Sequence, residues 1–336
     1  MPEQVDISVL IVAYASRDTL PRCLEALSAQ TVRPREVILL ENGSPDGQRI
    51  QAGEVPDWVE FIESPENLGY AAGNNRLAER AKGEWLALLN PDAFAHPDWL
   101  EQLWAATQRY PEISLFGSTQ YCAEKPELLD GAGDVYHAAG LAYRGAYLRP
   151  VSMLPIEGEV FAPCGAAAFV KADLFRALNG FDESFFCYNE DVDLAFRARL
   201  AGQRVIQLRY AAVDHAGYGS SGRRSDFATY YGVRNRLWVF LKDVPGWLFW
   251  LLLPVHAFAT LCLWFAAMKS KQFGLFSRAI WDGLKDWPRI MRARRAVQAE
   301  RKVSVLQVAR MMSWRSRQLL TREPDIRSYK ESVTPD

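Results

Sequence analysis

The chain has 336 residues, of which 49% are hydrophobic and 24% are charged, and these values exclude an intrinsically disordered protein. The length allows two domains or one large α/β domain with an appendage. The net charge of −1 conceals an uneven distribution: residues 269–336 hold 16 Lys and Arg against 7 Asp and Glu, whereas the first 268 residues hold 23 against 33.

Strand-like and helix-like segments alternate along the first third of the chain. Continuous apolar runs predict strands at 7–13, 36–40, 59–63 and 84–89. Helical spacing of apolar residues predicts helices over 20–27, 71–82 and 97–109. This order predicts right-handed crossovers and therefore an α/β fold with a mainly parallel, Rossmann-like sheet flanked by helices.

Ligands of such sheets bind beyond the carboxyl ends of the strands. The residues that follow the predicted strands are Tyr14, Glu41, the 67–75 loop and Asp92. The 67–75 loop leads into a helix N-terminus, which suits a diphosphate or nucleotide but equally fits a simple capped helix start. The convergence of these segments predicts a ligand site at this edge of the sheet.

From residue 121 onwards the pattern of apolar residues is less regular than in the first third of the chain. Residues 121–162 predict loops and short strands, and residues 166–170 a further strand. Helices are predicted over 172–178 and 191–200, and a strand over 205–208 runs towards Asp214 and His215. The five cysteines form no Cys-x-x-Cys pair and predict reduced, intracellular thiols, and the acidic, polar N-terminus predicts no secretory signal peptide.

Three short segments carry side chains suited to chemistry. In Asn90-Pro91-Asp92, a carboxylate just past a buried strand can hold a metal-bound diphosphate, although the same residues fit an ordinary turn that caps a helix. In residues 189–193, Glu190 and Asp191 open a helix beside an aromatic run, a setting that suits a sugar site but is also common at plain helix starts.

The third segment begins at His215. This histidine ends a strand and enters a glycine-containing loop, residues 216–220, in which Gly217 and Gly219 would allow close backbone approach to a ligand. It could bind a metal or contact phosphate, whereas a lone histidine is more often structural. His96, His137 and His256 have no comparable neighbours and receive no role.

Together these segments resemble family 2 glycosyltransferases with the GT-A fold, and rhamnosyltransferase-like members in particular. The resemblance covers roughly residues 6–240 and rests on landmarks in the expected order: 8–14, 37–47, 67–75, 88–92, 180–183, 190–197 and 215–220. Two positions depart from the family pattern. Glu41 stands where Asp is usual, and Asn90 replaces the first Asp of the metal-binding Asp-x-Asp motif, which is similar to a variant found among rhamnosyltransferase-like members.

The resemblance implies a role for each matching residue. Asp191 is the expected catalytic base, with Glu190 its neighbour, and Asp92 and His215 are the expected ligands of a divalent metal, Mg²⁺ or Mn²⁺. The residues expected to bind the nucleotide sugar are Ala13, Tyr14, Glu41, Asp46, Asn67, Gly69, Asn74, Asn75 and Asp92. The implied reaction is transfer with inversion, from a nucleotide-diphosphate sugar, with dTDP-rhamnose suspected, to a lipid-linked or glycan acceptor of cell-envelope polysaccharide synthesis.

The expected organisation has three parts: a nucleotide-sugar-binding half over 1–115, an acceptor-binding and catalytic half over 116–240, and C-terminal helices over 241–336. Residues 247–268 are uncharged and long enough, about 33 Å as a helix, to cross a bilayer. A single crossing would export the basic tail, against the positive-inside tendency. We therefore expect an in-plane or re-entrant segment, although a buried core helix is also compatible.

Residues 278–302 predict an amphipathic basic helix. Ile280, Leu284, Trp287 and Met291 form an apolar stripe, and the accompanying basic residues are Lys285, Arg289, Arg292, Arg294 and Arg295. Such a helix fits an anionic membrane surface or, alternatively, packs on the catalytic domain. We expect a cytoplasmic protein associated with the inner face of the cell membrane.

Three functions other than sugar transfer differ in how far the sequence supports them. A catalytically inactive nucleotide-sugar-binding scaffold would explain Asn90 and Glu41. A nucleotidyltransferase would usually carry a glycine-rich, basic loop after the first strand, unlike residues 13–18 here. Nucleic acid is not expected as a partner, because the basic tail has no recognisable nucleic-acid-binding motif.

Overall fold

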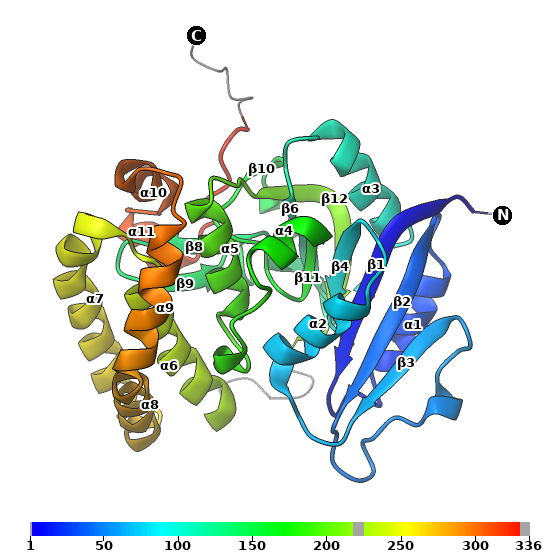
Figure 1. Cartoon of the computed structure of the whole chain (residues 1–336), viewed down its shortest axis with the longest axis horizontal. Coiled ribbons are helices and arrows are strands. Elements are labelled where there is room, and N and C mark those ends of the chain that lie inside the picture. The colour runs from blue at the N-terminus through cyan, green and yellow to red at the C-terminus, as the bar shows by residue number, and fades with distance from the viewer. Residues whose placement is uncertain (1, 218–224, 330–336) are drawn as a thin grey trace.

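The computed structural model describes residues 2–217 and 225–329 (Figure 1). Most of the glycine-containing loop predicted after His215, including Gly219, lies outside these ranges. The described chain contains one large mixed sheet covered by helices, with a helical region beside it (Figure 1).

Parallel strands form one side of the sheet. They are β1 (Gln4–Ala13), β2 (Arg33–Asn42), β3 (Val59–Ser64) and β4 (Trp85–Leu89), in the order β3-β2-β1-β4. The predicted strands and parallel pairing of the first third are therefore confirmed. Alternate residues of β1 enter two different core clusters, Leu10 in one and Val9 and Ile11 in the other, because helices cover both faces.

The helices divide between these faces. On the face of Val9 and Ile11 lie α1 (Leu20–Ser28) and α3 (Trp99–Arg109). On the face of Leu10 lie α2 (Gly69–Arg80), α4 (Ala172–Ala177) and α5 (Glu190–Leu200). Short 3₁₀ turns occur at η1 (Ala52–Glu54), η2 (Val151–Met153) and η3 (Glu183–Phe185).

The other side of the sheet is mixed. Strand β11 (Ala167–Lys171) runs antiparallel to both β4 and β6 (Leu115–Cys122), and β12 (Ile206–His215) runs parallel to β6. The expected halves on either side of residue 115 thus share one sheet. Strand β12 is longer than predicted, because its end pairs with β5 (Ala93–Ala95). The remaining strands are β7 (Lys125–Gly131), β8 (Asp134–His137), β9 (Leu141–Arg144) and β10 (Gly158–Glu159).

The helical region begins at Asp226 and not at residue 241 as predicted, since one unbroken helix, α6 (Asp226–Asp243), spans that position. The helices that follow are α7 (Gly246–Ala266), α8 (Phe273–Lys285), α9 (Trp287–Ala299), α10 (Val305–Met311) and α11 (Ser316–Thr321). The chain then returns to the sheet edge, where Arg327 and Glu159 exchange two backbone hydrogen bonds of 2.9 and 2.7 Å.

Helix α7 packs on the rest of the protein along one side only. Leu248, Phe249 and Leu252 join the main core cluster. His256 is buried, stacks on Phe240 and donates from Nδ1 to the Ala139 carbonyl at 3.0 Å. Within the described residues, α7 is the one helix long and apolar enough to span a membrane.

The predicted amphipathic helix over 278–302 is divided at Asp286 into α8 and α9, and its basic residues do not share one face. Arg289 donates to the Ser184 hydroxyl at 2.6 Å, and Arg294 donates to the carbonyls of Leu241 and Val244. Helix α9 therefore packs on the protein, the alternative considered from the sequence. Arg292 and Arg295 are exposed.

Candidate active site

Asp92 and His215 meet because of strand pairing. Strand β5 follows Asp92 directly and runs antiparallel to the end of β12, which sets Ala93 opposite His215. The Asp92 carbonyl accepts from the Ala216 amide at 2.9 Å, which fixes the turn. Asp92 Oδ1 lies 3.4 Å from His215 Nε2. The structure thus brings together two residues 123 positions apart that were predicted as metal ligands.

The other nitrogen of His215 has a partner that the sequence did not reveal. Asp130, on β7, has Oδ2 at 2.7 Å from His215 Nδ1 and also forms an ion pair with Arg144 on β9. Burial alone would lower the pKa of His215, but the hydrogen bond with Asp130 and the nearby Asp92 carboxylate outweigh burial and raise that pKa to about 9.

The donor atoms of Asp92 and His215 fit a divalent cation. His215 Nε2 is buried and has no hydrogen-bond partner within the described part of the chain. A carboxylate oxygen and an imidazole nitrogen are ligand types that divalent cations accept, and here they face each other at 3.4 Å. An Asp130 carboxylate on Nδ1 is the arrangement that orients metal-binding histidines.

Asp191 sits at the first turn of α5, where the helix dipole favours a carboxylate. Its Oδ2 accepts from the Gly165 amide at 2.9 Å, and its Oδ1 accepts from the Val192 amide at 2.8 Å. Burial nevertheless raises the pKa of Asp191 above its usual value, which favours proton uptake. A carboxylate with a raised pKa is a stronger base, which suits proton abstraction from a hydroxyl.

Glu190 is more deeply buried than Asp191. Burial and the neighbouring Asp191 charge both raise the pKa of Glu190 well above its usual value. One of its oxygens, Oε2, has no partner within the described residues. The two acids therefore differ: Asp191 is anchored by backbone amides, whereas Glu190 favours the protonated form.

A polar cavity of about 350 Å³ joins these groups. Asp191 and Glu190 line it together with Asn90, Arg144, Asp134 and Cys164. Arg144 connects the cavity to the Asp92–His215 pair through Asp130. The expected acids and histidine thus belong to one connected cluster.

A second group of possible ligands lies within this cavity. Asp134, Cys164 and Asp191 each offer one atom within 4.8 Å of the others. Burial raises the pKa of the Cys164 thiol to about 12, which disfavours the thiolate that binds metals. Asp92 and His215 are therefore the better metal-binding pair.

The predicted donor-binding residues near β1 and β2 shape a loop. Glu41 is fully buried, and its two carboxylate oxygens accept from the Ser44 and Ile50 amides at 2.7 and 3.0 Å. The Ser44 hydroxyl accepts in turn from the Ala15 amide at 2.9 Å, next to Ala13 and Tyr14. Asp46 is exposed at the tip of the loop. Glu41 thus braces the loop, and its contact with a nucleoside stays a prediction.

The 67–75 loop also has internal partners. The Asn67 side chain bonds to Asn42 and to the Gly69 amide, and Asn74 donates to the Tyr70 carbonyl at 3.0 Å. Asn75 accepts from the Phe181 amide at 2.8 Å and donates to the Phe181 carbonyl at 2.9 Å. These contacts hold Asn74 and Asn75 within the protein, and their contact with the donor stays a prediction.

Comparison with known proteins decides the family. A profile of glycosyl transferase family 2 matches residues 8–175, and an N-acetylglucosaminyl-diphospho-decaprenol L-rhamnosyltransferase of Mycobacterium tuberculosis is 30% identical over 273 residues, covering 72% of this chain and 86% of the relative. The chain belongs to glycosyl transferase family 2. It is a glycosyltransferase, and the predicted likeness to rhamnosyltransferases is confirmed.

Other relatives agree with this assignment. The O-antigen biosynthesis protein RfbC of Myxococcus xanthus is 31% identical over 238 residues, covering 65% of this chain and 18% of RfbC. Among solved structures, the mannosyltransferase PcManGT from Pyrobaculum calidifontis, in complex with GDP-Man and Mn²⁺, has a TM-score of 0.51 at 16% identity and covers 92% of this chain and 88% of its own. This likeness confirms the predicted GT-A fold.

Sequence reasoning did not identify three residues of the candidate site: Asp130, Asp134 and Arg144. All lie in the 121–162 segment, whose sequence has no periodic pattern and predicts only loops and short strands. The one available signal was Gly131, since the Arg144 side chain lies 2.6 Å from where a Cβ of residue 131 would be. A glycine beside an acid in an irregular segment does not by itself reveal that contact.

Proposed function

We propose that this family 2 glycosyltransferase moves a sugar, with inversion, from a nucleotide-diphosphate donor to a hydroxyl of a lipid-linked or glycan acceptor. The proposal rests chiefly on one arrangement: the Asp191 carboxylate lines the cavity that Arg144 links to Asp92 and His215. A single anchored base is what direct displacement by an acceptor hydroxyl requires.

Each residue has a defined part in the proposed reaction. Asp191 takes the proton from the acceptor hydroxyl, and the Gly165 amide holds its carboxylate in place. Burial raises the pKa of Glu190, which limits the negative charge beside the base. Asp92 and His215 would hold Mg²⁺ or Mn²⁺, which when bound supplies positive charge to offset that of the diphosphate leaving group.

The relative from Mycobacterium tuberculosis supports the identity of the substrates. Its name specifies rhamnosyl transfer to a sugar carried on a decaprenyl diphosphate. We infer that dTDP-rhamnose is the donor here and that the acceptor is a sugar on a polyprenyl diphosphate used in envelope polysaccharide synthesis.

The test of this function is a transfer assay with the full chain. Purified protein is incubated with Mg²⁺ or Mn²⁺, polyprenyl-diphosphate N-acetylglucosamine and a panel of dTDP-, UDP- and GDP-sugars, and the anomeric configuration of the product is determined by NMR. We expect transfer from dTDP-rhamnose with inversion. Donor binding without transfer across the panel would favour the inactive scaffold instead.

The outer side of α7 supports a position at the membrane. Trp250 and Phe258 are each 71% exposed, and Trp281 on the adjacent α8 is 70% exposed. The basic residues Lys269, Lys271 and Arg278 lie between Phe258 and Trp281 along the chain and are exposed too. We infer that α7 lies in the plane of the cytoplasmic leaflet, because a crossing would withdraw buried His256 from its contacts.

Vesicle binding tests this position. The Trp250→Ser/Phe258→Ser double variant is compared with wild type for sedimentation with vesicles that contain anionic phospholipid. We expect at least tenfold weaker binding, because each buried aromatic side chain contributes about 1.5–3 kcal/mol. Tyr210→Ser, which removes a 66% exposed aromatic residue from β12, is the control. Equal binding by all three proteins would exclude α7 as the docking surface.

A further inference from the structure

The segment that leads into α5 has an unusual backbone. We call residues 184–189 the acid loop, since they join η3 to Glu190 and Asp191. Phe186 has φ 66° and ψ −62°, and the Cys187 amide bonds to the Phe185 carbonyl at 2.7 Å. This is a γ-turn of the rare, strained kind. Tyr188 and Asn189 also have positive φ, 70° and 66°.

Residues other than glycine seldom adopt such conformations in succession. They persist only when surrounding contacts determine the backbone more strongly than its own preferences do. The direction of α5, and hence the position of both acids, depends on this loop, because Glu190 is the first residue of the helix.

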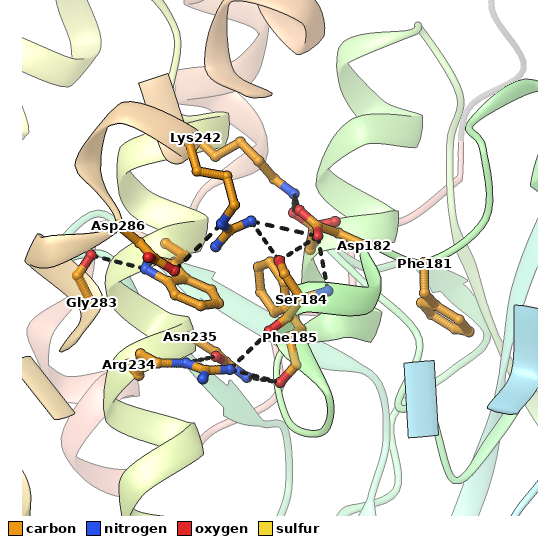
Figure 2. Close-up of polar contacts among 12 residues, drawn as sticks. Phe181, Asp182, Ser184, Phe185, Arg234, Asn235, Lys242, Gly283 and Asp286 are labelled. Carbon is orange, nitrogen blue, oxygen red and sulfur yellow. Dashed lines mark hydrogen bonds and ion pairs between the residues drawn. The ribbon is translucent and has the colours of Figure 1, made fainter. Parts of the chain in front are cut away.

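Helix α6 supplies the strongest of these contacts. The Asn235 side chain is fully buried, and its Nδ2 lies 2.8, 2.8 and 2.7 Å from the carbonyl oxygens of Phe185, Cys187 and Tyr188. Two N–H groups are thus shared among three acceptors of one loop. Figure 2 shows Asn235 and Arg234 reaching this backbone from α6.

Arg234 reinforces Asn235. Its Nη2 donates to the carbonyls of Ser184 and Phe185 at 2.9 and 3.1 Å, and its Nε donates to Asn235 Oδ1 at 2.9 Å. This last bond fixes which end of the Asn235 amide faces the loop. The Phe185 carbonyl therefore receives donors from the γ-turn, from Asn235 and from Arg234.

The acid loop is held from its other side by α2. The Phe186 carbonyl accepts from the Ala71 amide at 3.2 Å, and it would lie 2.5 Å from a Cβ at Gly69. The Phe186 ring stacks on Tyr231 of α6, with centroids 5.2 Å apart. The loop is thus enclosed between the start of α2 and α6.

Helix α6 also holds both flanks of the acid loop. Lys242 Nζ lies 2.7 Å from Asp182, which precedes the loop, and 2.5 Å from Asp193, two residues after Asp191. Figure 2 shows the Lys242–Asp182 contact beside the Arg234 and Asn235 contacts. One helix therefore contacts the chain before, within and after the loop.

We propose that Asn235, supported by Arg234, is a positioning residue that sets the place of Glu190 and Asp191 through the acid loop. The proposal rests on the proposed function, in which Asp191 is the base. Asn235 contacts neither acid and acts only by fixing backbone. A merely structural residue would instead lower the melting temperature without altering turnover by the folded enzyme.

The test compares Asn235→Ala with Gln298→Ala. Gln298 is the matched control, because its amide donates to the carbonyls of Asp243 and Lys242 at 2.9 and 3.3 Å, at the far end of the same helix. Three quantities are measured on the full chain: hydrogen–deuterium exchange of residues 184–189, the Kd of dTDP by calorimetry, and kcat for sugar transfer.

For Asn235→Ala we expect at least tenfold faster exchange in the acid loop, because the lost bonds lower its opening free energy. We expect kcat to fall about 100-fold, as for a catalytic group displaced by about 1 Å. The Kd of dTDP should change less than threefold. Asn235→Gln, which keeps the donors, should recover part of kcat.

Two outcomes would overturn the proposal. Exchange of the acid loop in Asn235→Ala that matches Gln298→Ala would show that Asn235 does not hold the loop. Faster exchange with unchanged kcat would show that the held geometry does not matter for transfer. If the wild type transfers no sugar, the proposed function fails, and the exchange comparison still decides whether Asn235 holds the loop.

Discussion

Asp92 and Asp191 are positioned by two different kinds of backbone. Asp92 follows a regular buried strand, and ordinary sheet pairing between β5 and β12 brings it to His215. Asp191 follows three residues with positive φ, and side chains from a helix some 45 positions later hold that backbone in place. The first arrangement tolerates local change because the whole sheet supports it, whereas the second depends on a few buried polar contacts.

The largest expected effect tests Asp191 itself. Asp191→Asn keeps the shape and one acceptor for the Gly165 amide but removes the base, so kcat should fall by about 10²–10⁴-fold with an unchanged melting temperature. In the wild type, the acidic limb of kcat/KM against pH should lie above 3.8, the ordinary pKa of Asp, because burial raises the pKa of Asp191. Near-normal turnover by Asp191→Asn would exclude this residue as the base.

The next effect tests the buried charges around the acid loop. Lys242→Met leaves the carboxylates of Asp182 and Asp193 without their shared cation, which should lower the free energy of unfolding by about 3–5 kcal/mol. Lys171→Met, which removes a half-exposed pair with Glu84, is the control and should cost less than about 1 kcal/mol. Chemical denaturation of both variants measures the difference, and equal losses would contradict the argument.

The same cluster predicts a pH dependence of stability. Burial alone would raise the pKa of Asp182, but the Lys242 charge outweighs burial and lowers it to about 2. Because the unfolded value is higher, near 3.8, this contribution is present above about pH 4 and is lost as the pH falls towards 2. In Lys242→Met the decrease in stability over that interval should be smaller, as measured by thermal unfolding.

A smaller effect is expected at the pair of Asp92 and His215, which is positioned by sheet pairing. Asp130→Asn removes the charge that orients His215 through Nδ1, so the affinity for Mn²⁺ should fall about 10–100-fold by calorimetry. Glu84→Gln removes a half-exposed carboxylate that pairs with Lys171 outside the candidate site, and it serves as the control. The assignment of Asp130 fails if both variants bind Mn²⁺ like the wild type.

The smallest effect concerns Asn75. Asn75→Ala should lower the free energy of unfolding by about 1–2 kcal/mol, because its amide is bonded to both the amide and the carbonyl of Phe181. The affinity for dTDP should not change. A large loss of nucleotide affinity with normal stability would instead support the donor-binding role inferred from the family resemblance.

The same contrast explains what could be predicted from the sequence. Apolar runs such as residues 7–13 and 84–89 identify buried strands, and sheet topology then places the residues that follow them at one edge. Asp92, Asp191 and His215 were found in this way, together with the family motifs. The fold of residues 1–115 was therefore accessible almost in full.

The features that the sequence did not reveal were missed for one physical reason. Asp130, Asp134 and Arg144 lie on short strands whose pairing depends on contacts distant in the chain, and no local period reveals them. The sequence left open whether Arg289 and Arg294 face a membrane or pack on the protein, for a related reason. Periodicity shows that basic residues lie on one helix, but not that their guanidinium groups bond to distant backbone and hydroxyl groups.

The return of the chain at Arg327 has a practical consequence. Its backbone pairing with Glu159 covers β10, the outermost strand of the sheet on that side. An uncovered strand of this kind offers free amides and carbonyls to neighbouring molecules. Shortened versions that remove the hydrophobic helices together with the last residues would uncover the backbone of Glu159, so soluble variants are better made by replacing exposed α7 side chains than by truncation.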